Sequence, residues 1–332
     1  MAKVRKLAAP CIRATTLALL FVVASQLSSV NAQFEIYPER PVRFVVGFGQ
    51  GGPTDVVARV LADELTQILK HNVYVENKPG ASGNIATQTV ATAPPDGYTF
   101  LIGASPIAVN RWLFPDFNFL LDRDIIALAP IGATANALVV HPALKVKNLR
   151  DLIALDREKP DTITYATLGR GSSSHLAGVA FNLAAGTKLV AVPYRGNGDA
   201  LQDLMGQHVK VWFATIPSVL EQIRAGQLVA LGTTGPNRTS WLPDVPTIAE
   251  SGFAGYDVRL WVGVFAHAGV PQDRVARFGS AIENAMGSQK MQRTLEAQGI
   301  SSMRMTRDAF AQFVRDETAR WKDVVANMKD AP

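Results

Sequence analysis

The sequence predicts an α/β protein built from mainly parallel sheets that are flanked by helices. From residue 41 onward, β-branched runs alternate with stretches of helical periodicity, and glycine-rich turns separate many of them. This alternation occurs over residues 41–105 and again after residue 140, with no low-complexity linker between the two series. We therefore expect two lobes, each a mainly parallel sheet with helices on both faces.

The first 32 residues have the pattern of a secretion signal. Basic residues precede a short apolar stretch at residues 14–24, and small residues lead to a cleavage site that ends at Ala32. An uncleaved membrane anchor is the alternative, but a bilayer-spanning helix needs about 20 apolar residues. We expect residues 1–32 to be a signal peptide, cleaved after Ala32, and the mature protein to lie in the periplasm.

Charge and cysteine usage exclude several classes of function. The chain has 33 Lys and Arg and 28 Asp and Glu, but four of the basic residues lie in the signal, which leaves 29 against 28. A nearly neutral mature chain argues against nucleic acid and membrane surfaces as partners. Cys11, the only cysteine, lies in the signal, and the five histidines are scattered singly. No disulfide, metal site or cofactor is expected.

The first series of elements ends near residue 105. It predicts strands at residues 42–46, 73–76 and 98–102, and helices that begin at Pro53 and Ile85. The second series predicts helices at residues 149–157, 175–184 and 198–206, and strands at residues 163–166, 189–193, 209–213 and 228–231. Residues 234–248 are rich in turn formers, residues 256–266 predict a strand, and the remainder is mostly helical.

Three glycine-rich loops open predicted helices: the first loop (residues 47–55), the second loop (80–85) and the third loop (169–175). Such a turn presents free N–H groups and the positive end of the helix dipole to an anion. Ligands of open α/β sheets bind at the carboxyl ends of strands. We interpret the three loops as an uncharged cradle for a carboxylate. For any single loop, an ordinary strand-to-helix turn remains an equal alternative.

A dinucleotide site is the main rival interpretation of the first loop. Residues 47–52 fit the pattern G-x-G-x-x-G, and Glu76 follows Gly52 by 24 positions. The motif is short, and Pro53 follows it directly. A nicotinamide cofactor is also not expected outside the cytoplasm, so we favour the anion cradle.

No catalytic constellation is evident, and we do not expect an enzyme. The patterns G-x-S-x-G and H-E-x-x-H are both absent. Ser172 to Ser174 precede His175, and a serine–histidine pair could be nucleophilic. We favour helix capping by the serines and structural hydrogen bonding by His175. Arg195 could clamp a carboxylate or could form a surface or interlobe ion pair, and both roles stay open.

An ordered set of segments across the mature chain resembles one receptor family. The chain is similar to the periplasmic substrate-binding receptors of tripartite tricarboxylate transporters. The segments that carry the resemblance are Tyr37-Pro-x-Arg-Pro-Val-Arg-Phe-Val-Val46, Gly51-Gly-Pro-Thr-Asp55, Val75-Glu-Asn-Lys-Pro-Gly-Ala-Ser-Gly-Asn84, Pro95-Asp-Gly-Tyr-Thr99, Gly171-Ser-Ser-Ser-His175, Val192-Pro-Tyr-Arg-Gly196, Leu242-Pro-Asp-Val-Pro-Thr247 and Trp261-Val-Gly-Val-Phe-Ala266.

This resemblance implies a two-lobed periplasmic-binding-protein fold of type 2, joined by crossing hinge strands near residues 133–140 and 256–266. Lobe 1 would comprise residues 33–135 and 256–332, and lobe 2 residues 136–255. The implied function is to capture a small organic acid between the lobes, as a monomer, and to deliver it to membrane transporter subunits. There are two alternatives. One is a sensory receptor that presents its ligand to a membrane kinase, and the other is a periplasmic enzyme on the same fold.

By position, the resemblance and the adjoining polar residues give the expected ligand contacts. They are Phe48, Gly49, Gln50, Gly51, Gly52, Thr54, Asp55, Ala81, Ser82, Gly83, Asn84, Ala104, Ser105, Arg170, Gly171, Ser172, Ser173, His175, Tyr194, Arg195, Gly196 and Ala214.

Three of these residues depart from the family's usual pattern. Gln50 stands where proline is usual, and its amide could donate to a ligand. Ala214 stands where many members have an aspartate that could answer a ligand amine. Arg170 adds a positive charge to the third loop. These departures favour an anionic ligand, a dicarboxylate or an aromatic acid, over an amino acid.

Overall fold

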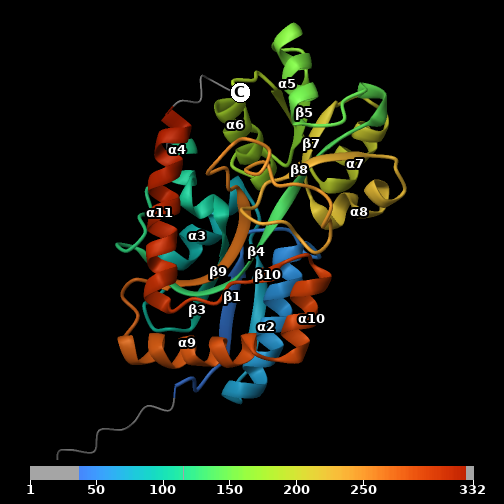
Figure 1. The fold of residues 1–332 in the computed structure, drawn as a ribbon. Coiled ribbons are helices and arrows are strands. Elements are labelled where there is room, and N and C mark those ends of the chain that lie inside the picture. Colours follow the sequence, from blue (N-terminus) through green and yellow to red (C-terminus); the bar gives the residue numbers. More distant parts are fainter. Residues whose placement is uncertain (1–36, 115, 327–332) are drawn as a thin grey trace, which may run out of the picture. The chain divides into compact units, whose positions relative to one another are not determined.

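Two sheets share one long strand in the computed structural model, which describes residues 37–114 and 116–326 (Figure 1). Contacts divide the chain into two units, residues 1–39 and 40–332, and every helix and strand described lies in the second. The predicted signal peptide and its cleavage site lie outside the described residues and stay a prediction. Within residues 37–114 and 116–326, no helix combines the length and the apolar content needed to cross a bilayer.

The first sheet has the strand order β2-β1-β3-β9-β4. Its members are β1 (Val42–Val46), β2 (Val73–Asn77), β3 (Thr99–Ala104), β9 (Arg259–His267) and β4 (Ile125–Val140). The strands β2, β1 and β3 are parallel, whereas β9 is antiparallel to both of its neighbours. The short β10 (Ser301–Ser302) also pairs with β4.

The second sheet begins where β4 leaves the first. Residues 136–140 of β4 pair antiparallel with β7 (Val211–Thr215), and residues 137–140 pair antiparallel with β8 (Val229–Thr233). Beyond β7 lie β5 (Thr164–Thr167) and β6 (Val190–Pro193), both parallel. The outer strands of each sheet are thus parallel, as predicted. The pairs beside β4 are antiparallel because the chain crosses on β4 and returns on β9. The predicted fold class is confirmed, while the residue boundaries of the two lobes stay a prediction.

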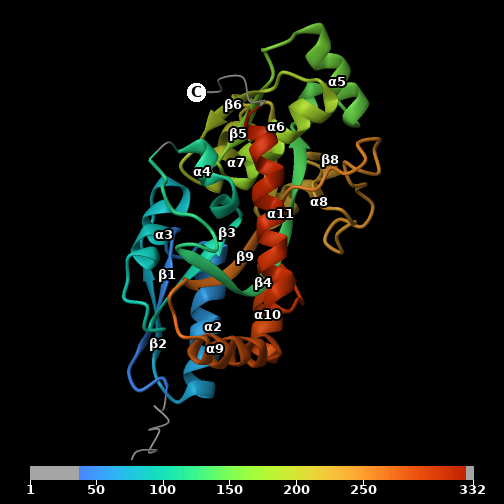
Figure 2. The same cartoon turned by 90° about the vertical axis from the view of Figure 1, so that its left-hand side faces the viewer.

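Helices cover both sheets and agree with most of the predicted periodicity. They are α2 (Pro53–Leu69), α3 (Asn84–Ala91), α5 (Leu149–Glu158), α6 (Ser173–Ala185), α7 (Asn197–Met205), α9 (Gln272–Met286), α10 (Gln289–Ala297) and α11 (Arg307–Ala326). The sequence patterns did not predict α4 (Asn110–Leu113), α8 (Ile216–Arg224) or the 3-10 turns η1 (Ala81–Gly83), η2 (Ser105–Ala108) and η3 (Pro142–Leu144). The long helix α11 packs along β4 and also contacts η2 and α6 (Figure 2).

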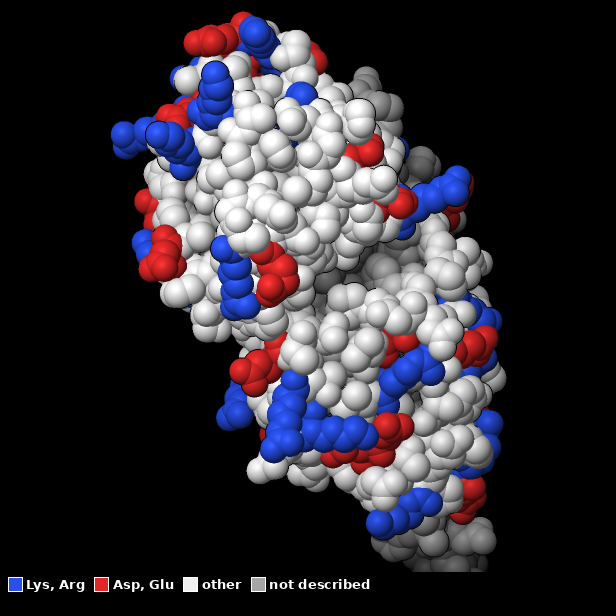
Figure 3. Space-filling model, turned by 90° about the vertical axis from the view of Figure 1, so that its right-hand side faces the viewer, with Lys and Arg blue, Asp and Glu red and all other residues white. Residues whose placement is uncertain are grey.

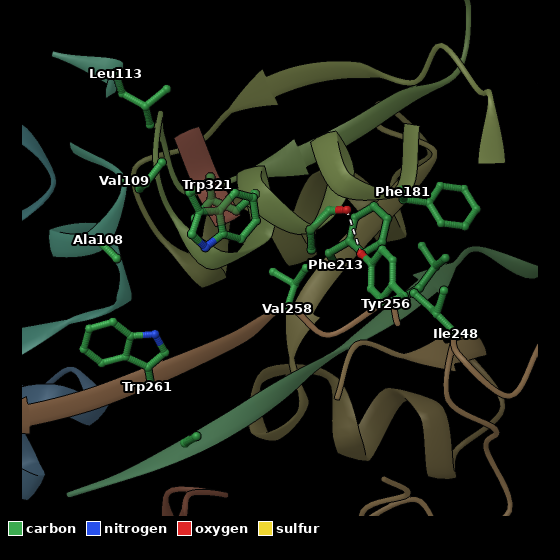
Figure 4. Close-up of a cluster of buried hydrophobic side chains, with 14 of the residues drawn as sticks. Ala108, Val109, Leu113, Phe181, Phe213, Ile248, Tyr256, Val258, Trp261 and Trp321 are labelled. Carbon is green, nitrogen blue, oxygen red and sulfur yellow. Dashed lines mark hydrogen bonds between the residues drawn. The ribbon is translucent and has the colours of Figure 1, made fainter. Parts of the chain in front are cut away.

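One apolar cluster continues from the first sheet to the second (Figure 4). The ring of Trp261, on β9, meets Phe310 of α11 edge-on with 6.1 Å between ring centroids. Farther along, the Tyr256 hydroxyl donates to the Ala177 carbonyl of α6 at 2.8 Å. Because large aromatic side chains contribute most to burial, this cluster fixes α11 and α6 against the shared strand.

Candidate ligand-binding site

The first and second glycine loops touch each other at the carboxyl ends of β1 and β2. A Cβ atom on Gly47 would lie 2.7 Å from the Gly83 Cα, so only glycine permits this approach. The second loop also has four successive residues with positive φ, which are Gly80, Ala81, Ser82 and Gly83. This conformation curls the backbone into a tight turn before α3.

Asp55 organises the first loop from within. Its buried carboxylate accepts hydrogen bonds from Gly51 N at 2.9 Å, from Arg59 Nε at 2.9 Å and from Asn77 Nδ2 at 2.7 Å. Burial acts to raise the pKa of Asp55, but these hydrogen bonds and the Arg59 charge outweigh it and lower the pKa. Since the protein itself occupies both carboxylate oxygens, Asp55 shapes the loop and its negative charge is neutralised. Its expected contact with a ligand stays a prediction.

The tip of the first loop offers backbone donors to a ligand. Gly49, Gln50 and Gly51 are exposed, and the N–H groups of Gly49 and Gln50 donate to no described residue. Thr54 is buried at the start of α2. The loop therefore retains free donors and carries no free acid.

Asn110, which the sequence patterns did not single out, holds the second loop. Its Nδ2 donates to Ser82 O at 3.0 Å and to Asn84 Oδ1 at 2.5 Å. Its Oδ1 is buried without a partner among the described residues. No motif surrounds Asn110, so only its tertiary contacts identify it.

The third loop caps α6 with its own serines, as the capping interpretation predicts. Ser172 Oγ accepts from His175 N at 3.3 Å and donates to Gly169 O at 2.7 Å. Ser174 Oγ accepts from Leu168 N at 3.0 Å. The hydroxyls of these two serines are thus used inside the loop, and Ser173 is buried at the first helical position.

His175 is buried beneath the third loop as a neutral imidazole. Its Nδ1 accepts from Gly171 N at 3.3 Å. Burial lowers the pKa of His175 to about 4, and the positive charge of Arg170 contributes. The role supported by this geometry is structural hydrogen bonding, and direct contact with a ligand stays a prediction.

The second and third loops meet across the two sheets. Ser82 Oγ donates to the Arg170 carbonyl at 2.6 Å. A Cβ atom on Gly171 would lie 3.1 Å from Leu113 Cδ1 and 3.3 Å from Asn110 Oδ1. The loop that follows β5 of the second sheet therefore packs against the loop and helix α4 that belong to the first. The second loop thus contacts both the first and the third, and the carboxylate cradle stays a prediction.

The carboxyl end of β3 adds two expected contact residues. Ala104 lines a very small pocket with Gly47, Phe48, Ser82 and Gly83, and its volume is about 10 Å³. The next residue, Ser105, is buried, and its hydroxyl has no hydrogen-bond partner among the described residues. A buried hydroxyl without a partner is costly, so a ligand acceptor or a water molecule would stabilise it.

The segment after β6 carries one arginine close to the end of β5, where that strand leads into the third loop. Tyr194 N donates to Thr167 O at 2.8 Å, and its hydroxyl donates to Asp203 Oδ2 at 2.8 Å. Burial and then the Asp203 carboxylate raise the pKa of Tyr194 to about 12. Arg195 is exposed and forms no ion pair with a described residue, and Gly196 is the N-cap of α7. The interlobe ion-pair alternative for Arg195 has no support among the described residues.

Ala214 lies apart from the loop residues. It is fully buried on β7 in the apolar cluster beneath α7 and α8, with Ala200, Leu204 and Val219. A charged side chain at this position would be buried among apolar groups. Its expected contact with a ligand stays a prediction that this burial does not support.

Charges on the face that carries α7, α8, α2 and α10 are interspersed. Figure 3 shows acidic and basic side chains mixed, with a hollow between the upper and lower parts that is bordered largely by uncharged residues. Among the described residues, no group of three or more His, Cys, Asp or Glu is placed to hold a metal ion.

Comparisons with known proteins show which family the chain resembles. A family model described as "Tripartite tricarboxylate transporter family receptor" matches residues 57–329. Protein BugT of Bordetella pertussis is 36% identical over 293 residues, which cover 88% of this chain and 90% of that protein.

Two solved structures from Rhodopseudomonas palustris share the fold at a TM-score of 0.77 each. Rpa4515 with adipate is 32% identical, and the match covers 87% of this chain and 97% of that one. MatC with bound malate is 31% identical, and the match covers 87% of this chain and 100% of that one. The chain therefore belongs to the tripartite tricarboxylate transporter receptor family, whose members are periplasmic binding proteins and not enzymes.

Proposed function

We propose that this protein captures a small dicarboxylate among its three glycine loops and delivers it to a tripartite membrane transporter. The convergence of these loops across the two sheets is the observation that carries the proposal. Ser82 and Arg170 connect the second and third loops, and Gly171 packs against α4. A ligand held at such a junction is enclosed from both sheets.

The chemistry of the junction favours an anion. Gly49 and Gln50 offer free N–H groups, and Ser105 offers a buried hydroxyl. Asp55, the one acid among the expected contacts, is neutralised by Arg59. Hydrogen bonds from backbone N–H groups to a carboxylate are among the stronger ones because the acceptor is charged.

A dicarboxylate fits better than a monoacid because two arginines without an acidic partner among the described residues lie in the third loop and just after β6. Arg170 and Arg195 are both exposed, and neither forms an ion pair with a described residue. The relatives solved with adipate and with malate hold ligands that carry two carboxylates. An aromatic monoacid is the second candidate, since it would engage only one of the two charges.

Ligand capture is tested by thermal unfolding and native mass spectrometry of the purified protein. Four- to six-carbon dicarboxylates should raise the melting temperature, whereas their monoamides and diamines should not. Arg170→Gln combined with Arg195→Gln should weaken dicarboxylate binding by about tenfold or more. Arg224→Gln, which removes an exposed arginine paired with Glu221, is the matched control. Stabilisation by amines or neutral amides alone would contradict the proposal.

Delivery is tested separately by uptake of the acid found in the first experiment. Cells that lack this protein should take up the labelled acid more slowly than cells that produce it. Uptake that is unchanged, together with a ligand-dependent transcriptional response, would instead support the sensory alternative.

A further inference from the structure

A second cavity lies on the side of α4 that faces α11, and it shares one lining residue, Ile107, with the small pocket beside the glycine loops. Its volume is about 250 Å³, and it is bounded by η2, α4, the segment before β4 and α11. None of the 22 expected ligand contacts lines it. Most of its wall is apolar, with Trp112, Phe117, Phe119 and Leu121 as its largest apolar side chains.

Two hydrogen-bond donors in this wall have no acceptor within residues 37–114 and 116–326. The indole Nε1 of Trp112 is buried and has no partner among the described residues. The Arg111 guanidinium lies over the Trp112 ring, 4.3 Å from its centroid, and forms no ion pair with a described residue. A buried donor left without an acceptor is destabilising, so an acceptor that enters the cavity would stabilise the protein.

The remaining charges of the wall balance each other. Arg315 lies 3.3 Å from Asp122, and the two side chains neutralise one another. Lys322 approaches the Trp112 ring from 5.8 Å. Positive charge is therefore in excess around Trp112, and an anion is favoured over a cation.

We propose that this cavity binds a small amphipathic anion, a single aromatic ring or a short alkyl chain that carries one carboxylate. The carboxylate would accept from Trp112 Nε1 and pair with Arg111, and the apolar part would lie against Phe117 and Phe119. Ordinary ligand pockets span about 300–1,000 Å³, so a cavity slightly below that range suits one ring. This proposal is independent of the function proposed for the glycine loops.

The test uses 4-fluorobenzoate as the probe and fluorine NMR of the full mature protein as the readout. Saturable binding is expected below about 10 mM. Arg111→Gln and Trp112→Phe, which keeps a ring but removes the N–H donor, should each weaken binding by about tenfold. Neutral 4-fluorobenzyl alcohol should bind more weakly than the acid.

Matched variants separate this cavity from the glycine loops. Arg224→Gln should leave fluorobenzoate binding unchanged, and Arg170→Gln combined with Arg195→Gln reports any fluorobenzoate that binds at the glycine loops instead. Binding that is lost in the Arg170 and Arg195 variant but kept in Arg111→Gln would overturn the proposal, because the acid would then occupy the glycine loops. Absence of saturable binding, or equal binding of the alcohol, would also overturn it. Since Arg111 is exposed, Arg111→Gln keeps the test valid if Trp112→Phe unfolds.

Discussion

Asp55 connects the first glycine loop to α2 and β2 through a single carboxylate. Asp55→Asn leaves too few acceptor positions for Gly51, Arg59 and Asn77 and removes the ion pair. Because the carboxylate is buried while Arg59 is partly exposed, the expected loss is about 2–3 kcal/mol of unfolding free energy.

Urea denaturation of Asp55→Asn measures this loss, and Asp63→Asn is the matched control. Asp63 pairs with Lys290 at 3.1 Å, but both side chains are largely exposed, so its loss should be within about 0.5 kcal/mol. Equal effects of the two variants would contradict the organising role of Asp55.

His175 predicts a specific dependence of stability on pH. Its folded pKa of about 4 lies below the ordinary value of 6.5. Between these values the unfolded chain binds a proton that the folded protein does not, so the free energy of unfolding falls as pH decreases from 6.5. The loss between pH 6.5 and roughly pH 5 is about 1.5 kcal/mol. His175→Gln should remove this slope, as measured by denaturation at several pH values. An unchanged slope in the variant would assign it to other groups.

Single residues show where sequence reasoning reached its limit. The glycines and serines of the loops could be predicted because turns and helix caps are local. We expected Asp55 to contact a ligand. Its spacing to Arg59, four residues further along the same helix, could have indicated a local ion pair from the sequence alone. Asn110 could not be predicted, because its contacts with Ser82 and Asn84 join segments that only the fold brings together.

At the scale of elements, the junction of the second and third loops depends on glycine at position 171. Gly171→Ala should add backbone strain, because φ is +82°, and also press a Cβ against Leu113 and Asn110. Gly169→Ala has the same kind of strain, with φ of +95°, but its Cβ would meet no atom within 4 Å. We call the protein closed when the third loop contacts the second loop and α4, and open when these contacts are broken. Relative to Gly169→Ala, we expect Gly171→Ala to raise the ratio of open to closed molecules about tenfold.

Small-angle X-ray scattering of the two unliganded variants measures this shift. Gly171→Ala should show the larger radius of gyration. Identical values for the two variants would mean that the contact with α4 does not hold the loops together.

Elements that have strong local signals were predicted with boundaries close to those observed. β1 spans the predicted residues 42–46, and α2 begins at Pro53. The full extent of β4 was not predicted from periodicity. This strand contains Pro130 and Gly132, which weaken strand propensity. Its register against β9 shifts once between Ala127 and Ala129 and once between Pro130 and Gly132. Its 16 residues are instead held by pairing with two different sheets.

At the scale of the whole molecule, β9 is the strand that completes the first sheet. It lies between β3 and β4, and its partners are distant in sequence, as Phe100 pairs with Ala266 and Ile125 with His267. All strands of the second sheet lie within residues 136–233. Loop-closure entropy disfavours the distant pairings more than the near ones.

The position of β9 therefore sets an order in time for folding. The second sheet and the strands β2, β1 and β3 can each form from partners that are close in sequence. β9 can insert between β3 and β4 only after both of those strands are in place. In pulse-labelled hydrogen exchange during refolding, amides of Val262 to Phe265 should gain protection after those of Phe213 and Val139. Simultaneous protection would contradict this order. The strand that completes the first sheet is then the last to form, and until it does, the β3 and β4 edges that it will pair with stay open to association with other chains.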